Sequence, residues 1–320
     1  MDEIKSVIIA TGSYLPEKIV TNDDLSKIMD TSDEWITSRS GIKSRRFAAE
    51  GEFTSDLAVH AANDALKSCH IDPNSLDAVI VATATPDNTF PSTASKVQHR
   101  IGMTSGFAFD IAAVCAGFIY AIANADALIR SGQAKRVMVI GAETFSRIMD
   151  WDDRTTAVLF GDGAGAVILE GQTGERGILS TDLNSDGQHH DLLYVDGGVS
   201  STGTSGKLRM QGKEVFKHAV QKLAASAETA LEKADLTSKD VDWIVPHQAN
   251  LRIIKATADK MGIPMEQVIV TVQEHGNTSA ASIPLALDHG VKSGQIRENQ
   301  VIAIEAIGGG LVWGAAIIRW

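Results

Sequence analysis

Short apolar segments alternate with longer amphipathic segments along the chain. The apolar segments have the length and composition of buried strands, and they lie at Val7–Ala10, Ala78–Ala82, Phe107–Ile111, Val137–Ile140, Ala166–Leu169, Trp243–Val245, Val268–Val270, Val301–Ile304 and Ala315–Ile318. Between them, the pattern predicts helices over Asp56–Ser68, Cys115–Ser131, Lys213–Lys233, Leu251–Met261 and Ala280–His289. This alternation predicts an α/β fold with mainly parallel sheets.

A weak internal repeat runs through this pattern. The stretch from Ala65 to Ile80 resembles the stretch from Ala230 to Val245 without a gap, 165 residues further on, and the same spacing places Val137–Val139 over Ile302–Ile304. Gly165–Ile168 also resembles Gly314–Ile317. We therefore predict two related halves, residues 1–172 and 173–320, that meet in the glycine-containing stretch Gly171–Gly177.

Composition narrows the function classes. The chain has 320 residues, 44% of them hydrophobic, which is typical of a globular protein and excludes disordered and collagen-like classes. Its net charge of −11 argues against nucleic-acid binding, which needs a basic surface. No apolar run approaches the ~18 residues of a membrane span, and the start, Met1–Lys5, lacks the features of a signal peptide. We expect a cytoplasmic protein that does not bind membranes.

The two cysteines, Cys69 and Cys115, are too few for a disulfide framework or a structural zinc site, so we expect free thiols. Cys115 follows a predicted strand and a short turn, at the predicted start of a helix. The positive end of the helix dipole at that place would lower the thiol pKa, and strand–turn–nucleophile–helix is a layout of acyl-transfer enzymes. The alternative is a buried cysteine of the core, which is the better reading for Cys69.

Two further reactive side chains follow predicted strands in the second half. His247 comes directly after Pro246, and Asn277 lies in a loop that we expect to be the counterpart of the Cys115 turn. Functional groups of open α/β sheets lie beyond the carboxyl ends of strands, so packing of the two halves would bring the three residues to one cleft. Either residue taken alone could be structural.

Other motifs leave more than one interpretation open. Gly161–Gly165 runs into a strand rather than a helix, so it lacks the context of a dinucleotide site. Both this motif and Gly308–Gly310 fit tight turns, close approach of the backbone or an oxyanion hole. The polar His189–Asp191 loop gives little reason to expect a metal. The basic segment Lys207–Lys222, followed by Arg252 and Lys255, is either a solvated face or a docking site for an anionic partner.

Over essentially its whole length the chain resembles β-ketoacyl-acyl carrier protein synthase III, the condensing enzyme that starts type II fatty acid synthesis. The motifs that carry this resemblance are Thr31-Ser32-Asp33-Glu34-Trp35-Ile36, Ala112-Ala113-Val114-Cys115-Ala116-Gly117-Phe118, Phe160-Gly161-Asp162-Gly163-Ala164-Gly165-Ala166, Pro246-His247-Gln248-Ala249-Asn250, Gly276-Asn277-Thr278-Ser279-Ala280 and Gly308-Gly309-Gly310. Val114 departs from the pattern, because this family usually has alanine there.

The resemblance implies a thiolase fold of two duplicated halves in five αβαβα layers, and a homodimer. It also implies roles for individual residues: Cys115 as nucleophile with His247 and Asn277 as partners; the backbone N–H groups of Cys115 and Gly309 as oxyanion hole; Thr31, Trp35, Arg39, Arg154 and Asn250 for coenzyme A; Phe90, Phe145 and Phe160 for the acyl pocket, with Phe90 reaching that of the partner; and Gln248, Ala249, Asn250, Leu251, Arg252 and Lys217 for carrier-protein docking.

By the same resemblance, Cys115 takes an acyl group from an acyl-CoA starter, acetyl-CoA or another short one. Malonyl-acyl carrier protein then loses CO2, and the resulting enolate, held by His247 and Asn277, attacks the acyl-cysteine. Neither metal nor redox cofactor is implied, since the coenzyme A thioester is a substrate.

Four rival interpretations are weaker. A biosynthetic thiolase needs a second active-site cysteine, and elongating synthases pair the cysteine with two histidines rather than His and Asn. A cysteine hydrolase uses Cys, His and Asn in this order but gives no reason for duplicated halves. A module that only binds acyl carriers would not need all three reactive residues.

Overall fold

The computed structural model describes residues 3–320, so Met1 and Asp2 of the predicted N-terminal start lie outside the described residues. Two mixed β-sheets form the frame. The first has the strand order β1 (Ile4–Tyr14), β7 (Asp162–Thr173), β6 (Arg136–Thr144), β4 (Ala78–Ala82) and β5 (Phe107–Ile111). The second has the order β8 (Gly177–Ser185), β13 (Val312–Arg319), β12 (Val301–Gly308) and β11 (Trp243–Pro246).

The two sheets repeat the same pattern of strand directions. In the first, β6, β4 and β5 are parallel, and β7 runs antiparallel to both β6 and β1. In the second, β12 and β11 are parallel, and β13 runs antiparallel to both β12 and β8. The predicted duplication is therefore present in the fold, and the placement of its boundary at residue 172 stays a prediction.

The strand predicted at Val268–Val270 is wrong. This segment lies beside β11 in the place that β5 has in the first sheet, but it makes only a parallel bridge between Val268 and Ile244. The Gln248 side chain takes the place of a strand partner: its amide donates to the Ile269 carbonyl at 3.1 Å, and its oxygen accepts from the Thr271 N–H at 2.8 Å. Those backbone groups are therefore satisfied without a strand partner.

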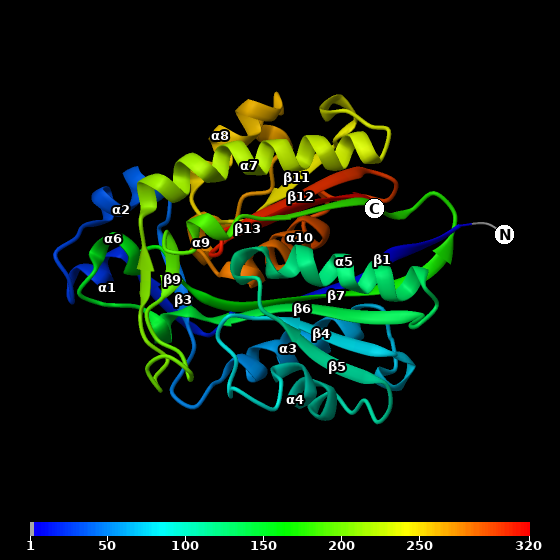
Figure 1. Ribbon diagram of the computed structural model, residues 1–320, viewed down its shortest axis with the longest axis horizontal. Coiled ribbons are helices and arrows are strands. Elements are labelled where there is room, and N and C mark those ends of the chain that lie inside the picture. Colours follow the sequence, from blue (N-terminus) through cyan, green and yellow to red (C-terminus); the bar gives the residue numbers. More distant parts are fainter. Residues whose placement is uncertain (1–2) are drawn as a thin grey trace.

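Helices and sheets stack in five layers (Figure 1). Helices α3 (Thr54–Ser68) and α4 (Thr93–Arg100) cover the outer face of the first sheet, and α7 (Gly212–Lys233) and α8 (Leu251–Met261) cover that of the second. Helices α5 (Gly117–Arg130) and α10 (Ser282–Lys292) lie between the sheets. The predicted αβαβα architecture is confirmed.

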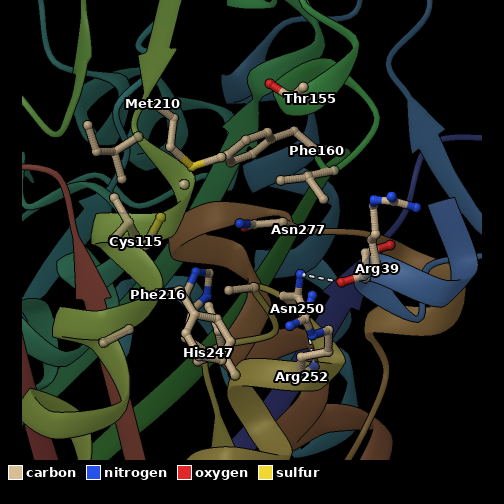
Figure 2. A pocket seen from close by; sticks show the side chains of 18 of the residues that line it. Arg39, Cys115, Thr155, Phe160, Met210, Phe216, His247, Asn250, Arg252 and Asn277 are labelled. Carbon is tan, nitrogen blue, oxygen red and sulfur yellow. Dashed lines mark hydrogen bonds between the residues drawn. The ribbon is translucent and has the colours of Figure 1, made fainter. Parts of the chain in front are cut away.

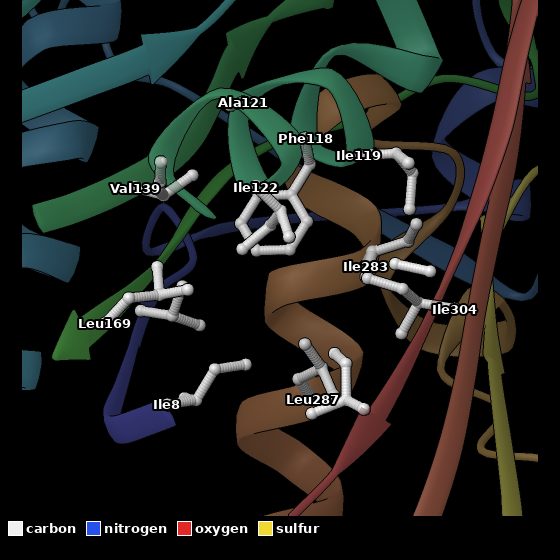
Figure 3. Close-up of a cluster of buried hydrophobic side chains, with 14 of the residues drawn as sticks. Ile8, Phe118, Ile119, Ala121, Ile122, Val139, Leu169, Ile283, Leu287 and Ile304 are labelled. Carbon is white, nitrogen blue, oxygen red and sulfur yellow. The ribbon is translucent and has the colours of Figure 1, made fainter. Parts of the chain in front are cut away.

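The largest buried cluster fills this middle layer (Figure 3). Phe118 and Ile122 of α5 and Leu287 of α10 pack there against apolar side chains of both sheets, such as Val139 and Ile304. Burial of a single side chain of this size contributes about 1.5–3 kcal/mol. Because both sheets share this layer, the two halves form one continuous core.

A short 3-10 turn precedes each middle-layer helix. Turn η2 (Val114–Ala116) leads into α5, and turn η7 (Ser279–Ala281) leads into α10. The first residue of each has a positive φ, 46° at Val114 and 49° at Ser279, and the two are 165 residues apart, as in the sequence repeat. Turn η2 packs against β12 of the second half, and η7 packs against β6 of the first. Each half thus supports the other half's turn.

This equivalence corrects two predictions. The helix expected from Cys115 begins at Gly117, and Cys115 lies in the preceding 3-10 turn. Asn277 is not the counterpart of Cys115, because the residue 165 positions after Cys115 is Ala280, the middle residue of η7. Asn277 lies three residues earlier, in the segment that leads into the turn.

Smaller elements gather at one end of the layers. They are the strand pairs β2 (Lys18–Thr21) with β3 (Ser44–Phe47) and β9 (Leu193–Val195) with β10 (Leu208–Met210), and the short helices α1 (Asn22–Ser26), α2 (Asp33–Ser40), α6 (Arg154–Ala157) and α9 (Val272–His275). Within residues 3–320, no helix has the length and apolar character needed to cross a membrane.

Candidate active site

A cavity of about 610 Å³ opens at this end of the molecule, and both halves line it. Cys115, His247 and Asn277 surround one space inside it (Figure 2). The remaining lining residues are Trp35, Ile36, Arg39, Ser40, Thr155, Val158, Leu159, Phe160, Leu193, Met210, Gly212, Lys213, Val215, Phe216, Ala219, Leu223, Ala249, Asn250, Arg252, Ile253 and Ile307. The predicted meeting of the three reactive residues is thus observed.

The Cys115 thiol is almost wholly buried, with 4% of the residue exposed. Burial raises its pKa to about 12; the Ser279 hydroxyl opposes this shift, and the charge of Glu143 adds to it. The expected lowering of the pKa by a helix start is therefore wrong, because desolvation of a thiolate outweighs it here and the helix begins after the residue. Cys115 and Cys69 are both free, as predicted, and Cys69 lies at the end of α3, away from the cavity.

His247 is held at the end of β11. Its backbone N–H donates to the Glu305 carbonyl at 2.8 Å, and its Nδ1 lies 2.6 Å from the Ser282 hydroxyl oxygen. Burial lowers the pKa of the imidazole to about 3, so the ring is neutral near pH 7. Within residues 3–320, the ring makes no hydrogen bond through Nε2, the nitrogen left for a substrate.

Asn277 is fixed through its backbone. Its N–H donates to the Leu159 carbonyl at 2.8 Å, and its carbonyl accepts from the N–H of Gly161 at 2.9 Å. A side chain at Gly161 would meet the His275 carbonyl at 2.7 Å, so the glycine is required for this approach. The Asn277 Oδ1 accepts from the Ser279 N–H at 2.9 Å, which leaves the amide NH2 group to donate.

The end of the cavity at α2 is aromatic and basic. Helix α2 is capped by Ser32, whose hydroxyl accepts from the Trp35 N–H at 3.1 Å, and it carries Trp35 and Arg39. The guanidinium carbons of Arg39 and Arg154 lie 4.5 and 5.2 Å from the centre of the Trp35 ring. A planar, anionic ligand would find stacking and charge at this end.

Comparisons with known proteins agree with this geometry. Residues 109–187 match the family described as 3-oxoacyl-[acyl-carrier-protein (ACP)] synthase III, and residues 231–320 match its C-terminal part. The chain is 65% identical to the β-ketoacyl-[acyl-carrier-protein] synthase III of Cereibacter sphaeroides, with 99% of each chain covered. The chain belongs to the β-ketoacyl-[acyl-carrier-protein] synthase III family.

Solved structures extend this result to the fold. The structure of 3-oxoacyl-[acyl-carrier-protein] synthase III from Aquifex aeolicus is 48% identical, with a TM-score of 0.95 over 98% of this chain and 100% of that one. The synthase III of Thermus thermophilus is also 48% identical, with a TM-score of 0.94 over 98% and 99% of the two chains. The predicted thiolase fold is thereby confirmed.

Several residues that the family resemblance assigned to substrates do not line the cavity. Arg154 lies beside the Trp35 ring and is paired with Asp30 at 2.9 Å, and Thr31 lies just before α2 in the chain. Gln248, expected on a docking surface, is fully buried and binds the backbone of the 269–272 segment. That expectation is wrong for Gln248: the backbone bonds that its amide makes require it to lie inside the protein.

The other expected docking residues differ in their surroundings. Ala249 and Asn250 line the cavity, and the Asn250 amide donates to the Arg39 carbonyl at 3.1 Å (Figure 2). Leu251 is half-buried against the core beneath α8. Arg252 and Lys217 are exposed and, within residues 3–320, form no ion pair with an acidic side chain.

Some charges of the basic segment Lys207–Lys222 are paired with acidic side chains. Arg209 forms ion pairs with Asp150 and with Asp196, the latter at 2.7 Å, and Lys222 lies 3.7 Å from Asp186. In this basic region, Lys207, Lys213 and Lys217 and, on α8, Arg252 and Lys255 have no acidic partner among the described residues.

The three phenylalanines expected at the acyl pocket have different environments. Phe160 lines the cavity, and Phe145 stacks against it with ring centres 5.0 Å apart. Phe90 is 84% exposed and does not reach the cavity of its own chain. Its expected place in a partner's pocket stays a prediction.

Gly308 packs closely against turn η2, and Gly309 packs closely against β9. A side chain at Gly308 would approach the Cys115 nitrogen to 2.8 Å, and one at Gly309 would approach the Leu193 carbonyl to 2.4 Å. The close-approach interpretation of this cluster is therefore confirmed, and the oxyanion hole stays a prediction.

Sequence reasoning missed the apolar wall of the cavity. Val215, Phe216, Ala219 and Leu223 come from one face of α7 and line it. Their helical spacing was visible in the sequence, but the same spacing is typical of a face buried in a core.

Proposed function

We propose that the protein condenses an acyl-CoA starter with malonyl-acyl carrier protein, with loss of CO2, to give a 3-oxoacyl-acyl carrier protein and CoA. The observation that carries this proposal is the meeting of Cys115, His247 and Asn277 inside one cavity, in a chain of the synthase III family. A reaction of this kind starts fatty acid synthesis.

The first half-reaction loads the enzyme. The Cys115 sulfur forms a bond to the acyl carbonyl carbon, the bond from that carbon to the CoA sulfur breaks, and the thiol proton passes to the departing CoA thiolate. Burial raises the pKa of this thiol to about 12, so its proton is transferred in the course of this half-reaction. The N–H groups of Cys115 and Gly309 would hold the oxyanion of the tetrahedral intermediate.

The second half-reaction makes the carbon–carbon bond. The malonyl group loses CO2, and the electron pair of the broken bond becomes an enolate whose oxygen accepts hydrogen bonds from His247 Nε2–H and Asn277 NH2. The enolate carbon attacks the acyl carbonyl, the bond to the Cys115 sulfur breaks, and the thiolate takes a proton from solvent. The two half-reactions balance without an oxidant, a reductant or a metal, and we propose no cofactor.

The end of the cavity at α2 suits coenzyme A. Trp35 and Arg39 offer a stacking face and positive charge to a nucleotide, Arg154 lies beside the Trp35 ring, and we assign Thr31 and Asn250 to the same ligand. We assign carrier-protein docking to Lys217, Arg252, Ala249, Asn250 and Leu251, because acidic partners associate faster with a basic rim.

We further propose a homodimer in the cytoplasm. Phe90 is the most exposed of the large apolar side chains described, and a partner subunit would cover it and bring it toward that subunit's acyl pocket. Phe160, backed by Phe145, would form the pocket wall in each chain, which suits a short starter such as an acetyl group.

Mass spectrometry of the intact protein after exposure to a panel of acyl-CoAs tests the proposal. We expect a stable acyl adduct with a short starter, absent from Cys115→Ala and retained in Cys69→Ala. Addition of malonyl-acyl carrier protein should discharge the adduct as a 3-oxoacyl product. Release of free acid instead would indicate a cysteine hydrolase, and failure to form any adduct would indicate a module that only binds acyl carriers.

A further inference from the structure

Ser282 is a buried serine of α10 that lies behind the imidazole of His247. Only 1% of the residue is exposed, and its hydroxyl oxygen lies 2.6 Å from His247 Nδ1. The same oxygen accepts the backbone N–H of Gln248 at 3.3 Å. Ser282 itself does not line the cavity, so any effect on a substrate must act through His247.

The two contacts determine where the hydroxyl proton goes. Because the Gln248 N–H already donates to the Ser282 oxygen, the serine proton is free to donate, and His247 Nδ1 is its one acceptor within residues 3–320. In the opposite arrangement, Nδ1–H would donate to the serine and the hydroxyl proton would be buried without an acceptor. Burial of an unsatisfied donor costs about 1–3 kcal/mol, so the first arrangement is favoured.

We propose that Ser282 is a positioning residue that fixes His247 as the tautomer with its proton on Nε2, so that the imidazole faces the cavity as a hydrogen-bond donor. The neutral ring has one N–H, and acceptance at Nδ1 assigns that proton to Nε2. Asn277 is oriented in the same way, because its oxygen is occupied by the Ser279 N–H and its NH2 group is left to donate.

This inference rests on the proposed function and refines it. The Ser282 contact would hold His247 in the donor form that the proposed enolate step needs, rather than as a base that removes the Cys115 proton. His247 should therefore serve the enolate step and matter little for acylation of Cys115. A base would require the opposite tautomer, with a free lone pair on Nε2.

The first test compares Ser282→Ala with Ser226→Ala. Ser226 is an equally buried serine, on α7, whose hydroxyl donates to Asp182 at 2.8 Å and which does not line the cavity. We expect Ser282→Ala to lower malonyl-acyl carrier protein decarboxylation about 10- to 100-fold, less than the ~10²–10³ of a deleted oxyanion donor. Cys115 acylation should change less than about twofold, and Ser226→Ala should leave both steps near wild type.

A double-mutant cycle separates positioning from simple destabilisation. If Ser282 acts through His247, Ser282→Ala should add almost nothing to the loss already caused by His247→Ala. A loss that persists in the His247→Ala background, or an equal loss of acylation, would overturn the proposal.

Nitrogen NMR of histidine-labelled protein reads the tautomer without any substrate, with the signal assigned by its loss in His247→Ala. We expect Nε2 to be protonated and Nδ1 to be a hydrogen-bonded acceptor in the wild type, and the Nδ1 signal to shift in Ser282→Ala. A wild-type proton on Nδ1 would refute the inference even if the condensation is confirmed. Absence of condensation with the expected tautomer would refute the proposed function alone.

Discussion

The turns η2 and η7 have the same backbone and different chemistry. Both begin at a residue with positive φ, both lead into a helix of the middle layer, and each packs against a central strand of the other half. Yet η2 carries Cys115 at its middle position, whereas η7 carries Ala280 there. Two polar residues of the second half flank this turn, Asn277 before it and Ser282 after it.

The comparison shows how duplication can divide a reaction between two halves. The shared backbone brings two turns to the centre of the molecule, and the side chains decide what each contributes. In the proposed reaction, the first half supplies the nucleophile, and the second half supplies the hydrogen-bond donors, His247 and Asn277. A sequence change that exchanges or removes these contributions tests that division directly.

The largest effect should come from the nucleophile position. Cys115→Ala should abolish acyl transfer and condensation, and Cys115→Ala combined with Ala280→Cys should not restore them. Ala280 is buried in the middle-layer core near Gly117 and does not line the cavity, so a thiol there cannot reach an acyl-CoA. Adduct formation by mass spectrometry measures both variants. An acyl adduct in the double variant, on the thiol introduced by Ala280→Cys, would show that the two turns are functionally interchangeable.

The donors of the second half should affect one half-reaction more than the other. His247→Ala and Asn277→Ala should each lower malonyl decarboxylation by ~10²–10³, the cost of one oxyanion-hole donor. Acylation of Cys115 should largely persist, since neither residue bonds to the thiol in the structure. Release of CoA and of CO2, followed separately, gives the two rates. Equal losses in the rates of CoA release and CO2 release would show that these residues act in the acylation of Cys115.

Acylation should also be insensitive to the charge of His247. Burial lowers the pKa of His247 to about 3, so the ring stays neutral from about pH 5 upward and neither rate should show a titration near pH 6.5 that disappears in His247→Ala. Rate profiles from pH 5 to 8 for wild type and variant provide the measurement. A histidine titration in that range, lost in the variant, would contradict the burial argument.

The equivalent strands β6 and β12 each carry a buried carboxyl group, and these should differ in their effect on stability. Burial raises the pKa of Glu143 to about 7, although Thr85 and the Ala84 N–H bind it, and raises that of Glu305 to about 8. Glu305 Oε2 has no hydrogen-bond partner among the described residues.

For both groups the folded state holds its proton to a higher pH than the unfolded state does. The free energy of unfolding should therefore fall as pH rises from about 5 to about 8. Glu305→Gln should flatten this dependence and gain more than about 1.4 kcal/mol relative to wild type between these pH values, the equivalent of one pKa unit. Denaturant unfolding at each pH measures it, with Glu143→Gln for comparison. Parallel curves for wild type and Glu305→Gln would refute the assignment.

The smallest effect should appear at the rim, where the two halves are predicted to serve different substrates. Lys217→Glu and Arg252→Glu, in the second half, should raise the apparent KM for malonyl-acyl carrier protein severalfold at low ionic strength. Arg39→Glu, in the first half, should raise that for acyl-CoA. Exposed charges are screened over about 8–10 Å near physiological ionic strength, so added salt should narrow the differences.

Kinetics over a salt series, with Lys239→Glu as an exposed control away from the cavity, measure these shifts. If Lys217→Glu and Arg252→Glu raise the apparent KM equally for malonyl-acyl carrier protein and for acyl-CoA, the rim does not distinguish a carrier protein from coenzyme A.

Sequence patterns predicted β4 and β5 most closely, although only β4 is buried along its whole length. Ala78–Ala82 and Phe107–Ile111 match β4 and β5 residue for residue, because a short apolar run between polar turns leaves little freedom for the boundaries. Strand β8 was missed, since Ser180, Thr181, Asp182 and Asn184 interrupt its apolar residues at the edge of its sheet. Its partner β13 makes it a strand, and such pairing is not visible within a single segment.

Cys115 and His247 were predictable because each follows a strand, where the fold places its functional groups, whereas Asn277 follows the short helix α9. The environment of these residues could not be predicted from the sequence. The raised pKa of Cys115 and the buried position of Gln248 depend on segments far away in the sequence, such as the one around Ile269. Desolvation is a property of packing, so no local motif carries it.

The reciprocal packing of the two turns also bears on where such a protein comes from. Turn η2 of the first half packs against β12 of the second, and turn η7 of the second half packs against β6 of the first. Each contact between the halves therefore has an equivalent contact in the opposite direction. That is the pattern of an isologous interface between two identical subunits related by a twofold axis. In a symmetric pair every substitution appears twice. A single fused chain removes this constraint, and one copy of the turn can keep a nucleophile while the other loses it.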